Sequence, residues 1–564
     1  MRHPSLNLEI NYPPEAYRYG KRASGETHGV VLTKPHIVDM ILDLAGYSED
    51  QDLSMKRMLE PSCGTGVFLV AAARRLIRSA RQHNRRASQL KACLLAYDID
   101  PRHVKTTRTA VEAVLIEEGV KNRVAKSLAE EWVRQNDFLL APLEGQTFDT
   151  IVGNPPYIRI EQLSPDLQNE YRSRYETLYD RADIYVAFIE RSLSLLPEKG
   201  TLSFICADRW TLNRYGAPLR RIIAENYQIK TYVDLHKTSP FESEVIAYPS
   251  IFAISPGKTG RVSVGRLSEA TPEECGDLTM RLRNPGRSNN GAVSVYPSWF
   301  VEDEPWVLSS PAHLKALRDL ESRFDTIEAD QKTSVRIGVA TGNDSAYIVG
   351  PDSGIEKNRL VPLVMRADLE KGQIKNNSRF VINTFDTKGK IIDLSGFPRL
   401  RQYLEEHGIA IRRRHVAKKN PGSWFRTIDR VYPELVPAQK LLIPDIAGSN
   451  EITLDTGKYH PHHNLYYVTS KSWDMAVLGG LLSSKVALFF IWSYATKMRG
   501  GYLRFQAQYL RRIRIPKPSD IPKQLCRDIR EAFRQRDFKK LDQLALQAYG
   551  IKKLPNFDFV DTRK

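Results

Sequence analysis

The sequence has few cysteines and no arrangement of them that supports a disulfide framework. Its 564 residues contain five, and none of them forms a Cys-x-x-Cys pair. They are Cys63, Cys93, Cys206, Cys275 and Cys526. This spacing disfavours disulfide-stapled scaffolds and cysteine-based zinc sites, and a reducing cytoplasm is expected.

The sequence also lacks a signal peptide and an uninterrupted membrane span. Its first twenty residues contain no apolar core of the kind that directs secretion. The most apolar stretch, Met475 to Ala495, is interrupted by Gly479-Gly480 and by Ser483-Ser484-Lys485, which predicts a buried helix. With 41% hydrophobic residues, the chain is expected to be an ordinary globular, cytoplasmic protein with no membrane partner.

The sequence has fewer acidic than basic residues, 66 Asp and Glu against 83 Lys and Arg. The formal net charge is +17 and the isoelectric point is about 9.4. This surplus predicts a polyanionic partner, most simply nucleic acid, but composition alone does not separate DNA, RNA and anionic membrane. The length predicts two to four domains at roughly 150 residues each.

Apolar runs alternate with helical patterns over residues 1–265, which predicts an α/β domain with a mostly parallel sheet. The pattern dissolves over 266–330, which we interpret as a connecting region. Residues 331–518 are richer in aromatics and less regular, and they predict a second, mixed α/β domain. Residues 519–564 have apolar positions at helical spacing and predict a C-terminal helical segment. Because ligands of parallel sheets bind beyond the carboxyl ends of the strands, functional residues are expected after each apolar run.

The first motif is the glycine-containing turn that runs from Glu60 to Leu69, between a strand and an amphipathic helix. Gly64 and Gly66 allow a bound molecule to approach the backbone, and the helix presents free N–H groups. The third glycine of a dinucleotide fingerprint is missing, and no phosphate-binding Gly-Lys-Ser/Thr follows.

Two further polar positions follow apolar strands. Asp98 ends the next strand, where a carboxylate can accept hydrogen bonds from a ribose diol. Asp137 and Phe138 come after a third, where a polar side chain and an aromatic ring suit an adenine. Taken together with the glycine turn, these positions predict a nucleoside pocket.

The most informative motif is Asn154-Pro155-Pro156-Tyr157, which follows the apolar strand Thr150-Ile151-Val152. Two prolines hold a rigid, extended turn. Asn154 offers an amide oxygen, the Pro155 carbonyl offers a second acceptor, and the Tyr157 ring can stack on a planar substrate. This combination is typical of a site that binds an exocyclic amino group on a conjugated ring.

On these motifs the chain resembles the adenine-N6-specific DNA methyltransferases of the NPPY type, in which the target-recognition region comes last. The resemblance implies a Rossmann-like, S-adenosylmethionine-dependent domain followed by a mixed α/β target-recognition domain. Upstream, residues 29–38 resemble the family's N-terminal motif, in which Thr33 is also expected to cap the following helix. The cofactor-binding residues implied by the resemblance are Thr33, Glu60, Ser62, Gly64, Gly66, Asp98, Ile99, Asp137, Phe138 and Phe188. The implied catalytic residues are Asn154, Pro155, Pro156 and Tyr157, and Phe241 resembles the second aromatic residue that flanks the extruded base.

The resemblance implies methyl transfer to N6 of an adenine flipped out of double-stranded DNA, without a metal ion. It also implies a prokaryotic modification enzyme, expected to be monomeric, with a separately encoded restriction endonuclease as a possible partner. Its DNA-binding residues are expected in two basic clusters of the recognition domain. They are Arg412, Arg413, Arg414, Lys418, Lys419, Lys497, Arg499 and Arg504. A third basic run, Arg74 to Lys91, is interpreted as a solvated helix surface, and His460, His462 and His463 as a polar loop.

Three alternatives remain open at this point. A methyltransferase of ribosomal RNA bases or of a protein glutamine would have a similar motif, but those enzymes are usually much shorter. A DNA-specificity subunit with a decayed catalytic domain is disfavoured by the intact Asn154–Tyr157 and Gly64–Gly66 motifs. A fused nuclease is disfavoured because only 20 to 30 residues precede the first family motif and no nuclease signature follows Pro444-Asp445.

Overall fold

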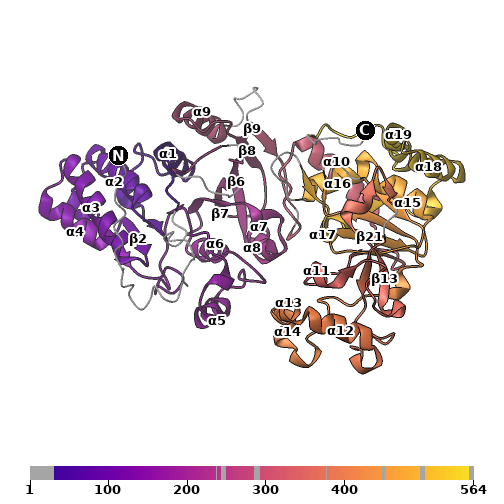
Figure 1. The fold of residues 1–564 in the computed structure, drawn as a ribbon. Helices are drawn as coiled ribbons and strands as arrows, with labels where there is room; N and C mark the ends of the chain where they lie inside the picture. Colours follow the sequence, from indigo (N-terminus) through magenta and orange to yellow (C-terminus); the bar gives the residue numbers. More distant parts are fainter. Residues whose placement is uncertain are drawn as a thin grey trace, which may run out of the picture. The chain divides into compact units, whose positions relative to one another are not determined.

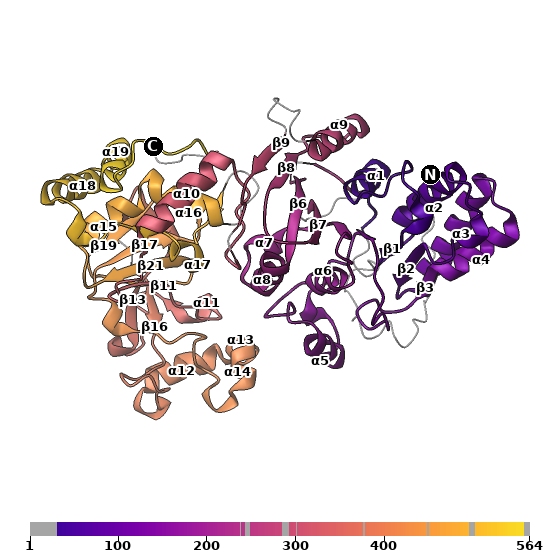
Figure 2. The ribbon, with the colours of Figure 1, turned by 180° about the vertical axis from the view of Figure 1, so that it is seen from behind.

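The computed structural model describes residues 31–236, 238–242, 249–284, 293–300, 302–375, 378–447, 451–495 and 502–557 (Figure 1). The chain divides into two compact units, Met1–Pro311 and Ala312–Lys564. Figure 2 shows both units from behind. Each unit has its own sheets and helices.

The first unit is built on a mixed sheet whose first five strands are parallel neighbours. β7 then runs antiparallel between β5 and β6, β8 runs parallel to β6, and β9 is antiparallel to β8. In spatial order the strands are β3 (Val133–Gln135), β2 (Leu94–Asp98), β1 (Met58–Glu60), β4 (Thr150–Gly153), β5 (Thr201–Ala207), β7 (Pro249–Pro256), β6 (Tyr227–Asp234), β8 (Val262–Arg266) and β9 (Val293–Tyr296). The Rossmann-like α/β prediction is confirmed, because the central strands are fully buried and parallel.

Helices connect these strands and bury one apolar face each. They are α1 (Pro35–Leu44), α2 (Val67–Gln82), α3 (Pro101–Glu117), α4 (Asn122–Trp132), α5 (Pro165–Arg174), α6 (Tyr185–Ser194), α7 (Arg209–Leu212), α8 (Ala217–Asn226) and α9 (Pro272–Arg283). In α2 the side chains of Phe68, Leu69, Ala72 and Leu76 are buried in the core. Their spacing of three to four residues is the pattern that predicts an amphipathic helix.

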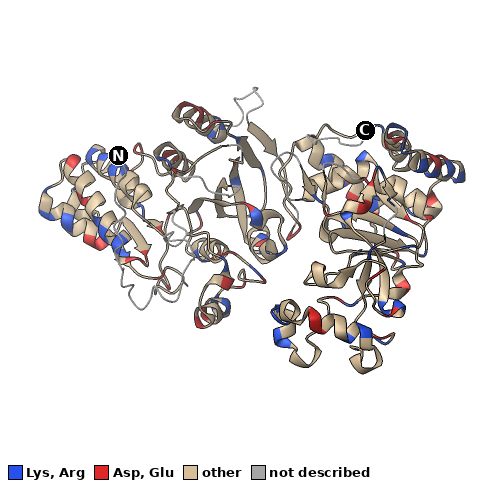
Figure 3. Cartoon of the chain, in the orientation of Figure 1, with Lys and Arg blue, Asp and Glu red and all other residues tan. Residues whose placement is uncertain are grey.

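The basic run from Arg74 to Lys91 begins on the opposite surface of α2 and continues past its end at Gln82, and most of its arginines are paired with acids. Arg75 bonds Asp43, and Arg78 bonds Glu118. Arg85 pairs with Asp52 at 2.8 Å. Figure 3 shows Lys and Arg interspersed with Asp and Glu over α2–α4. The interpretation of this run as a solvated surface holds for Arg74, Arg78 and Arg85, while the Arg75 side chain is only 13% exposed.

The structure differs from the predicted connecting region 266–330. α9 and β9 continue the first unit, and Cys275, Leu278 and Leu282 of α9 belong to the same core cluster as α1. Leu278 packs directly over Gly265 of β8. The loop-like composition of 285–291 obscured this continuation, and the two units divide at Pro311 instead.

The second unit combines two four-stranded sheets with helices, which confirms the mixed α/β prediction. One sheet is antiparallel, in the order β11 (Thr333–Ile337), β21 (Leu465–Ser470), β17 (Lys440–Pro444) and β19 (Thr453–Asp455). The other has the order β12 (Ile348–Val349), β16 (Phe380–Ile382), β13 (Leu360–Val364) and β20 (His460–Pro461). Two-stranded ribbons join β10 (Asp325–Thr326) to β23 (Arg514–Ile515), β14 (Leu369–Glu370) to β15 (Gln373–Ile374), and β18 (Ile446–Ala447) to β22 (Leu503–Arg504).

The helices of the second unit include several short ones. They are α10 (Pro311–Arg323), α11 (Asp344–Tyr347), α12 (Pro398–Glu406), α13 (Gly408–Arg412), α14 (His415–Lys419), α15 (Met475–Leu482), α16 (Lys485–Tyr494), α17 (Ala507–Leu510), α18 (Lys523–Gln535) and α19 (Phe538–Ala548). α18 covers α15, because a Cβ atom at Gly480 would lie only 2.5 Å from Ile529 Cγ2. The predicted C-terminal helical segment is thus packed onto the second unit.

The apolar stretch near residue 480 forms two helices rather than one. α15 and α16 are bent by 57° relative to each other, and nearly all their side chains are buried. Among the described residues no single helix is long and apolar enough to cross a membrane, although this bent pair passes the test of length and composition together.

An ion pair lies inside the second unit. Lys440 Nζ of β17 donates to Asp455 Oδ2 of β19 at 2.8 Å, and both side chains are fully buried. Burial lowers the pKa of Lys440, and the hydrogen bond to Asp455 partly opposes this. Asp455 also accepts backbone N–H bonds from Gly457, Lys458 and Tyr459. This carboxylate therefore holds a strand and the following turn together.

Candidate active site

A cavity of about 890 Å³, measured with its solvent-open part, lies at the carboxyl ends of β1, β2 and β4. This is where ligands of parallel sheets bind. Eleven of the predicted site residues line it. They are Thr33, Glu60, Ser62, Gly64, Asp98, Ile99, Asp137, Phe138, Asn154, Pro156 and Phe188. The residues that line the cavity do not include Gly66, Pro155, Tyr157 and Phe241.

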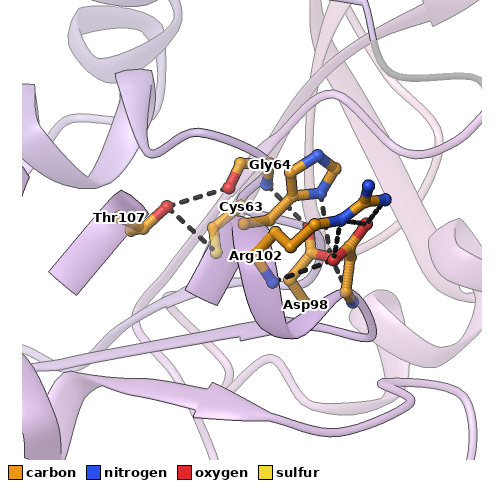
Figure 4. A network of polar contacts seen from close by, with 7 residues as sticks. Cys63, Gly64, Asp98, Arg102 and Thr107 are labelled. Carbon is orange, nitrogen blue, oxygen red and sulfur yellow. Dashed lines mark hydrogen bonds and ion pairs between the residues drawn. The ribbon is translucent and has the colours of Figure 1, made fainter. Parts of the chain in front are cut away.

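The glycine turn after β1 is held by contacts with β2 and α3 (Figure 4). Cys63 N–H donates to the Tyr97 carbonyl at 2.8 Å, and Gly64 N–H donates to Asp98 Oδ2 at 2.8 Å. Thr107 Oγ1 of α3 donates to the Gly64 carbonyl at 2.8 Å. The turn is therefore preorganised by its neighbours, with its backbone facing the cavity.

Gly66 has a structural role in this turn. Its φ is +92°, in the left-handed region that favours glycine. A Cβ atom there would lie 2.8 Å from Thr107 Cγ2. Only glycine therefore fits between the turn and α3.

We expect Gly66→Ala to weaken cofactor binding by at least about tenfold, because backbone strain of roughly 1–3 kcal/mol adds to the clash with Thr107. Isothermal titration calorimetry with the cofactor measures the loss. The double variant Gly66→Ala/Thr107→Ser removes the clashing methyl group and should recover part of the affinity. Wild-type affinity in Gly66→Ala would contradict this account.

Asp98 is only 7% exposed, and protein groups already hold its carboxylate. Oδ1 accepts the Asp100 N–H at 2.9 Å and lies 3.3 Å from His103 Nδ1, while Oδ2 accepts the Gly64 N–H. The hydrogen bond to Asp98 raises the pKa of His103, with partial burial opposing it. His103 also lines the cavity, and sequence reasoning missed it although it lies five residues after Asp98, in the first turns of α3.

The raised pKa of His103 has a consequence for stability. Protonated His103 stabilises the fold below its unfolded pKa of about 6.5, and this contribution is lost as pH rises through the higher folded value. Asp98 and Asp100 favour the charged form, and Arg102 opposes it. We expect the excess stability of wild type over His103→Gln to be largest below about pH 6.5 and to shrink above it. Urea unfolding at a series of pH values measures this, and a pH-independent difference would contradict it.

Glu60 is the most deeply buried acid of the cavity. It is 1% exposed, and its Oε2 has no hydrogen-bond partner among the described residues. Burial raises the pKa of Glu60 well above its usual value, and the nearby charge of Asp98 adds to the effect. A ligand that donates an N–H to this oxygen would satisfy it.

Two aromatic rings, Phe138 and Phe188, line the cavity. Phe138 and Phe188 are both buried, and their ring centroids lie 5.3 Å apart. The neighbouring Asp137 accepts a hydrogen bond from the Tyr171 hydroxyl at 2.6 Å and another from the Leu139 N–H. Phe138 and Phe188 thus form an apolar wall, and Asp137 is anchored beside them.

Asn154 follows β4 and faces the cavity with a free acceptor. Its Nδ2 donates to the Val31 carbonyl at 3.0 Å and contacts Thr33 Oγ1 at 3.4 Å. Its Oδ1 is buried and has no hydrogen-bond partner among the described residues. The amide is therefore fixed by its nitrogen, and its oxygen is left for a ligand.

Thr33 is held beside Asn154 by pairing with a distant segment. Thr33 and Phe241 form an antiparallel bridge, Lys34 N–H donates to the Pro240 carbonyl, and Glu242 N–H donates to the Leu32 carbonyl. The prediction that Thr33 caps the following helix is wrong by one residue. Lys34 is the N-cap of α1 and makes no side-chain cap, because Thr33 is committed to this bridge.

Tyr157 and Phe241 lie against each other rather than forming an open slot. Their ring centroids are 6.5 Å apart at an interplanar angle of 77°. The Tyr157 hydroxyl is buried without a partner, and Phe241 is 4% exposed. The contact between the two rings buries apolar surface of both. A planar group can therefore enter between Tyr157 and Phe241 only if the rings move apart. The Gly29, Val30 and Ser243 positions of the predicted motifs lie outside the described residues.

Comparison with known proteins identifies the family. The family described as Eco57I restriction-modification methylase matches residues 78–241, and the TaqI-like C-terminal specificity domain matches residues 367–515. The Type II methyltransferase M.PaeR7I of Pseudomonas aeruginosa is 45% identical over 546 residues, which cover 93% of this chain and 92% of that protein. This chain belongs to the Type II methyltransferases of restriction-modification systems.

Other relatives agree with this assignment. M.BstVI of Geobacillus stearothermophilus, also a Type II methyltransferase, is 44% identical over 542 residues, or 93% of this chain and 96% of that protein. Among solved structures, the Type IIL restriction-modification enzyme MmeI in complex with DNA has a TM-score of 0.62 at 14% identity. The match covers 93% of this chain and 75% of MmeI. The likeness to MmeI concerns the fold alone.

In this Type II methyltransferase the predicted DNA-binding residues have different environments. Arg413, Lys418 and Lys419 are exposed. Arg412 is exposed too, and its guanidinium lies 3.5 Å from the centroid of the Trp424 ring. Figure 3 shows Lys and Arg on α13 and α14. Lys497 and Arg499, with Gly500 and Gly501, lie outside the described residues.

Arg414 and Arg504 are used inside the second unit. The Arg414 guanidinium donates to the carbonyls of Ile411, Thr341, Trp424 and Arg426 and to the Tyr347 hydroxyl. Arg504 forms a two-bond pair with Asp445, at 3.1 and 2.7 Å. The sequence does not reveal these contacts, because their partners are far apart along the chain. Both arginines hold local structure in the described state.

The three histidines do not form a polar loop, so that interpretation is wrong. His460 lies in β20 and His462 follows it, and each is 2% exposed. Burial lowers the pKa of His460 to about 4. His463 is exposed. Backbone hydrogen bonds hold this segment against two others. The His462 N–H donates to the Val364 carbonyl of β13, and the His463 N–H donates to the Val339 carbonyl just after β11.

Proposed function

We propose that this Type II methyltransferase transfers a methyl group from S-adenosylmethionine to the N6 amino group of an adenine in double-stranded DNA. The observation that carries the proposal is the buried, unpartnered Oδ1 of Asn154, at the edge of the cavity. An amide oxygen in that position is suited to accept a hydrogen bond from an exocyclic amino group.

The cavity residues fit the proposed cofactor. The lining of the cavity combines buried acids, a glycine turn and aromatic rings at the carboxyl ends of parallel strands, where nucleoside-containing ligands of such sheets bind. The unpartnered Glu60 Oε2 suits a donor such as an ammonium group, and the apolar wall of Phe138 and Phe188 suits a planar base. When bound, S-adenosylmethionine supplies an electrophilic methyl group on a sulfonium.

The protein contributes position and electrostatics to the transfer. Asn154 Oδ1 and the Pro155 carbonyl accept the two hydrogens of the amino group. These two hydrogen bonds draw the nitrogen lone pair out of conjugation with the ring, and they stabilise the positive charge that develops on the nitrogen. The two prolines keep both acceptors at a fixed distance, and Thr33 and Val31 fix the Asn154 amide from behind.

The proposed base must leave the duplex to reach Asn154. Unstacking costs a few kcal/mol, and contact with an aromatic ring returns roughly 1–3 kcal/mol per base. Tyr157 and Phe241 are the rings placed to supply it, once the edge-to-face contact between them opens. The exposed Arg412, Arg413, Lys418 and Lys419 are proposed to contact DNA phosphates. A monomeric state and a separate cognate endonuclease remain predictions.

Incubation of the purified chain with labelled S-adenosylmethionine and duplex DNA of mixed sequence tests the proposal. Digestion to nucleosides should give N6-methyladenine, and sequencing of modified bases should find it in one short sequence context. Ribosomal RNA and a glutamine-containing peptide serve as control substrates. Methylated cytosine, or methylation of a control substrate with unmodified DNA, would overturn the proposal.

A further inference from the structure

A second group of polar side chains lies in the second unit, outside the cavity. Asp344, His462 and His463 each present one atom capable of ligating a metal, and the three atoms lie within 4.8 Å of one another. Asp344 begins α11, more than a hundred residues before the histidines. The sequence therefore shows two neighbouring histidines without an acid, and folding supplies the acid.

His462 is the buried member of the group. Its side chain is 2% exposed, its Nε2 faces Asp344 Oδ2 at 3.1 Å, and its Nδ1 has no hydrogen-bond partner among the described residues. The rings of His462 and His463 are 4.0 Å apart between centroids. The His462 imidazole is thus buried beside a second imidazole and a carboxylate, yet one of its nitrogens lacks a hydrogen bond to any described residue. Buried polar atoms usually have such a partner, so a ligand would supply what the protein does not.

The backbone under this group is held firmly. Val339 and His462 form a parallel β-bridge between two segments of the chain. Gly338 leaves no room for a side chain, since a Cβ atom there would lie 2.2 Å from the His462 carbonyl oxygen. On the other side, Thr341 Oγ1 donates to Asp344 Oδ1. The three potential ligands are thus carried by two loops whose backbones are fixed against each other.

We infer that Asp344, His462 and His463 form a binding site for a divalent transition-metal ion such as Zn²⁺. Two imidazole nitrogens and one carboxylate oxygen are a common ligand set for zinc, with water completing the shell. Zinc–ligand distances of about 2.0–2.2 Å place neighbouring ligand atoms roughly 3.4 Å apart. Small rotations of the exposed Asp344 and His463 side chains would bring the group to that spacing. Asp429, which accepts the Ala340 N–H, adds negative charge near His463.

The ion would stabilise structure rather than take part in methyl transfer. It would link the turn Thr341–Asp344 to the segment between β20 and β21. The Thr341 carbonyl in that turn accepts a hydrogen bond from Arg414, which lies between the basic helices α13 and α14. The metal site is therefore connected by two contacts to the basic segment 412–419.

Equilibrium dialysis of tag-free, full-length protein against micromolar ZnCl₂, followed by elemental analysis, tests the inference. Wild type should retain about one zinc per chain at this site, and the melting temperature should rise with zinc concentration. Asp344→Asn and His463→Gln change exposed side chains and should fold normally. Each should lower zinc affinity by at least about tenfold and shift the zinc-dependent rise in melting temperature to correspondingly higher zinc concentrations. His415→Ala, at another exposed histidine of the same unit, is the matched control and should retain zinc as wild type does.

Two outcomes would overturn the inference. One is wild-type protein that retains no zinc above a protein-free control. The other is equal retention by wild type, Asp344→Asn and His463→Gln, which would place any bound zinc elsewhere. Neither outcome depends on methyl transfer, so the proposed function can fail while the metal site stands, and the reverse.

Discussion

We expect Asn154→Ala to reduce the rate of methyl transfer by roughly 10²–10³-fold or more, the usual effect of removing a group that stabilises developing charge. Cofactor affinity should change little, because the glycine turn, Glu60 and Asp98 remain in place. Single-turnover methylation and calorimetric cofactor binding measure the two quantities separately. Equal losses in both would show that Asn154 mainly holds the cofactor pocket together.

Asn154→Asp separates the two roles of the side chain. Aspartate keeps an acceptor oxygen but loses the amide N–H that donates to the Val31 carbonyl. If the main role of Asn154 is to accept a hydrogen bond from the amino group, Asn154→Asp should retain clearly more methyl-transfer activity than Asn154→Ala. If the two variants are equally inactive, anchoring of the segment at residues 31–33 is the dominant role.

The second large effect concerns stability. We expect Asp455→Ala to lower the free energy of unfolding of the second unit by about 3–5 kcal/mol, the usual result of leaving a buried charge without its partner. Lys440 would lose its counter-ion, and three backbone N–H groups would lose their acceptor. Urea unfolding followed by circular dichroism measures the change.

The matched control is the exposed pair of Lys375 and Glu370. Its atoms are 2.9 Å apart, nearly the same distance as in the buried pair, but both side chains are more than half exposed. Glu370→Ala should therefore change the free energy of unfolding far less than Asp455→Ala does, because solvent screens the exposed pair. Similar losses for Asp455→Ala and Glu370→Ala would mean that burial does not control the strength of these ion pairs.

The sequence predicts the parallel sheet and most of the cavity, because both depend on local patterns. Apolar runs predict strands, and in a parallel sheet the residues that follow neighbouring strands meet at one edge. Glu60 and Asp98 end β1 and β2, Asp137 and Asn154 follow β3 and β4, and all four line the same cavity. Their convergence required no knowledge of long-range contacts beyond the order of the strands.

What the sequence does not predict depends on contacts between distant segments. The bridge between Thr33 and Phe241, the carboxylate of Asp344 beside His462, and the internal bonds of Arg414 join residues that no periodicity relates. A basic side chain in a cluster looks the same in sequence whether it faces DNA or bonds a carbonyl. The turn-rich composition of residues 285–291 likewise gave no sign that β9 would return to the sheet.

The bridge between Thr33 and Phe241 bears on the energetics of binding as well as on geometry. Thr33 lines the cavity proposed for the cofactor, while Phe241 contacts the ring of Tyr157, which is proposed to stack on the base. One pair of backbone segments thus contributes to both proposed binding sites. If a ligand in the cavity orders these two segments, they have less conformational entropy left to lose when DNA binds. Thermodynamic reciprocity then requires that DNA tighten cofactor binding by the same factor by which the cofactor tightens DNA binding.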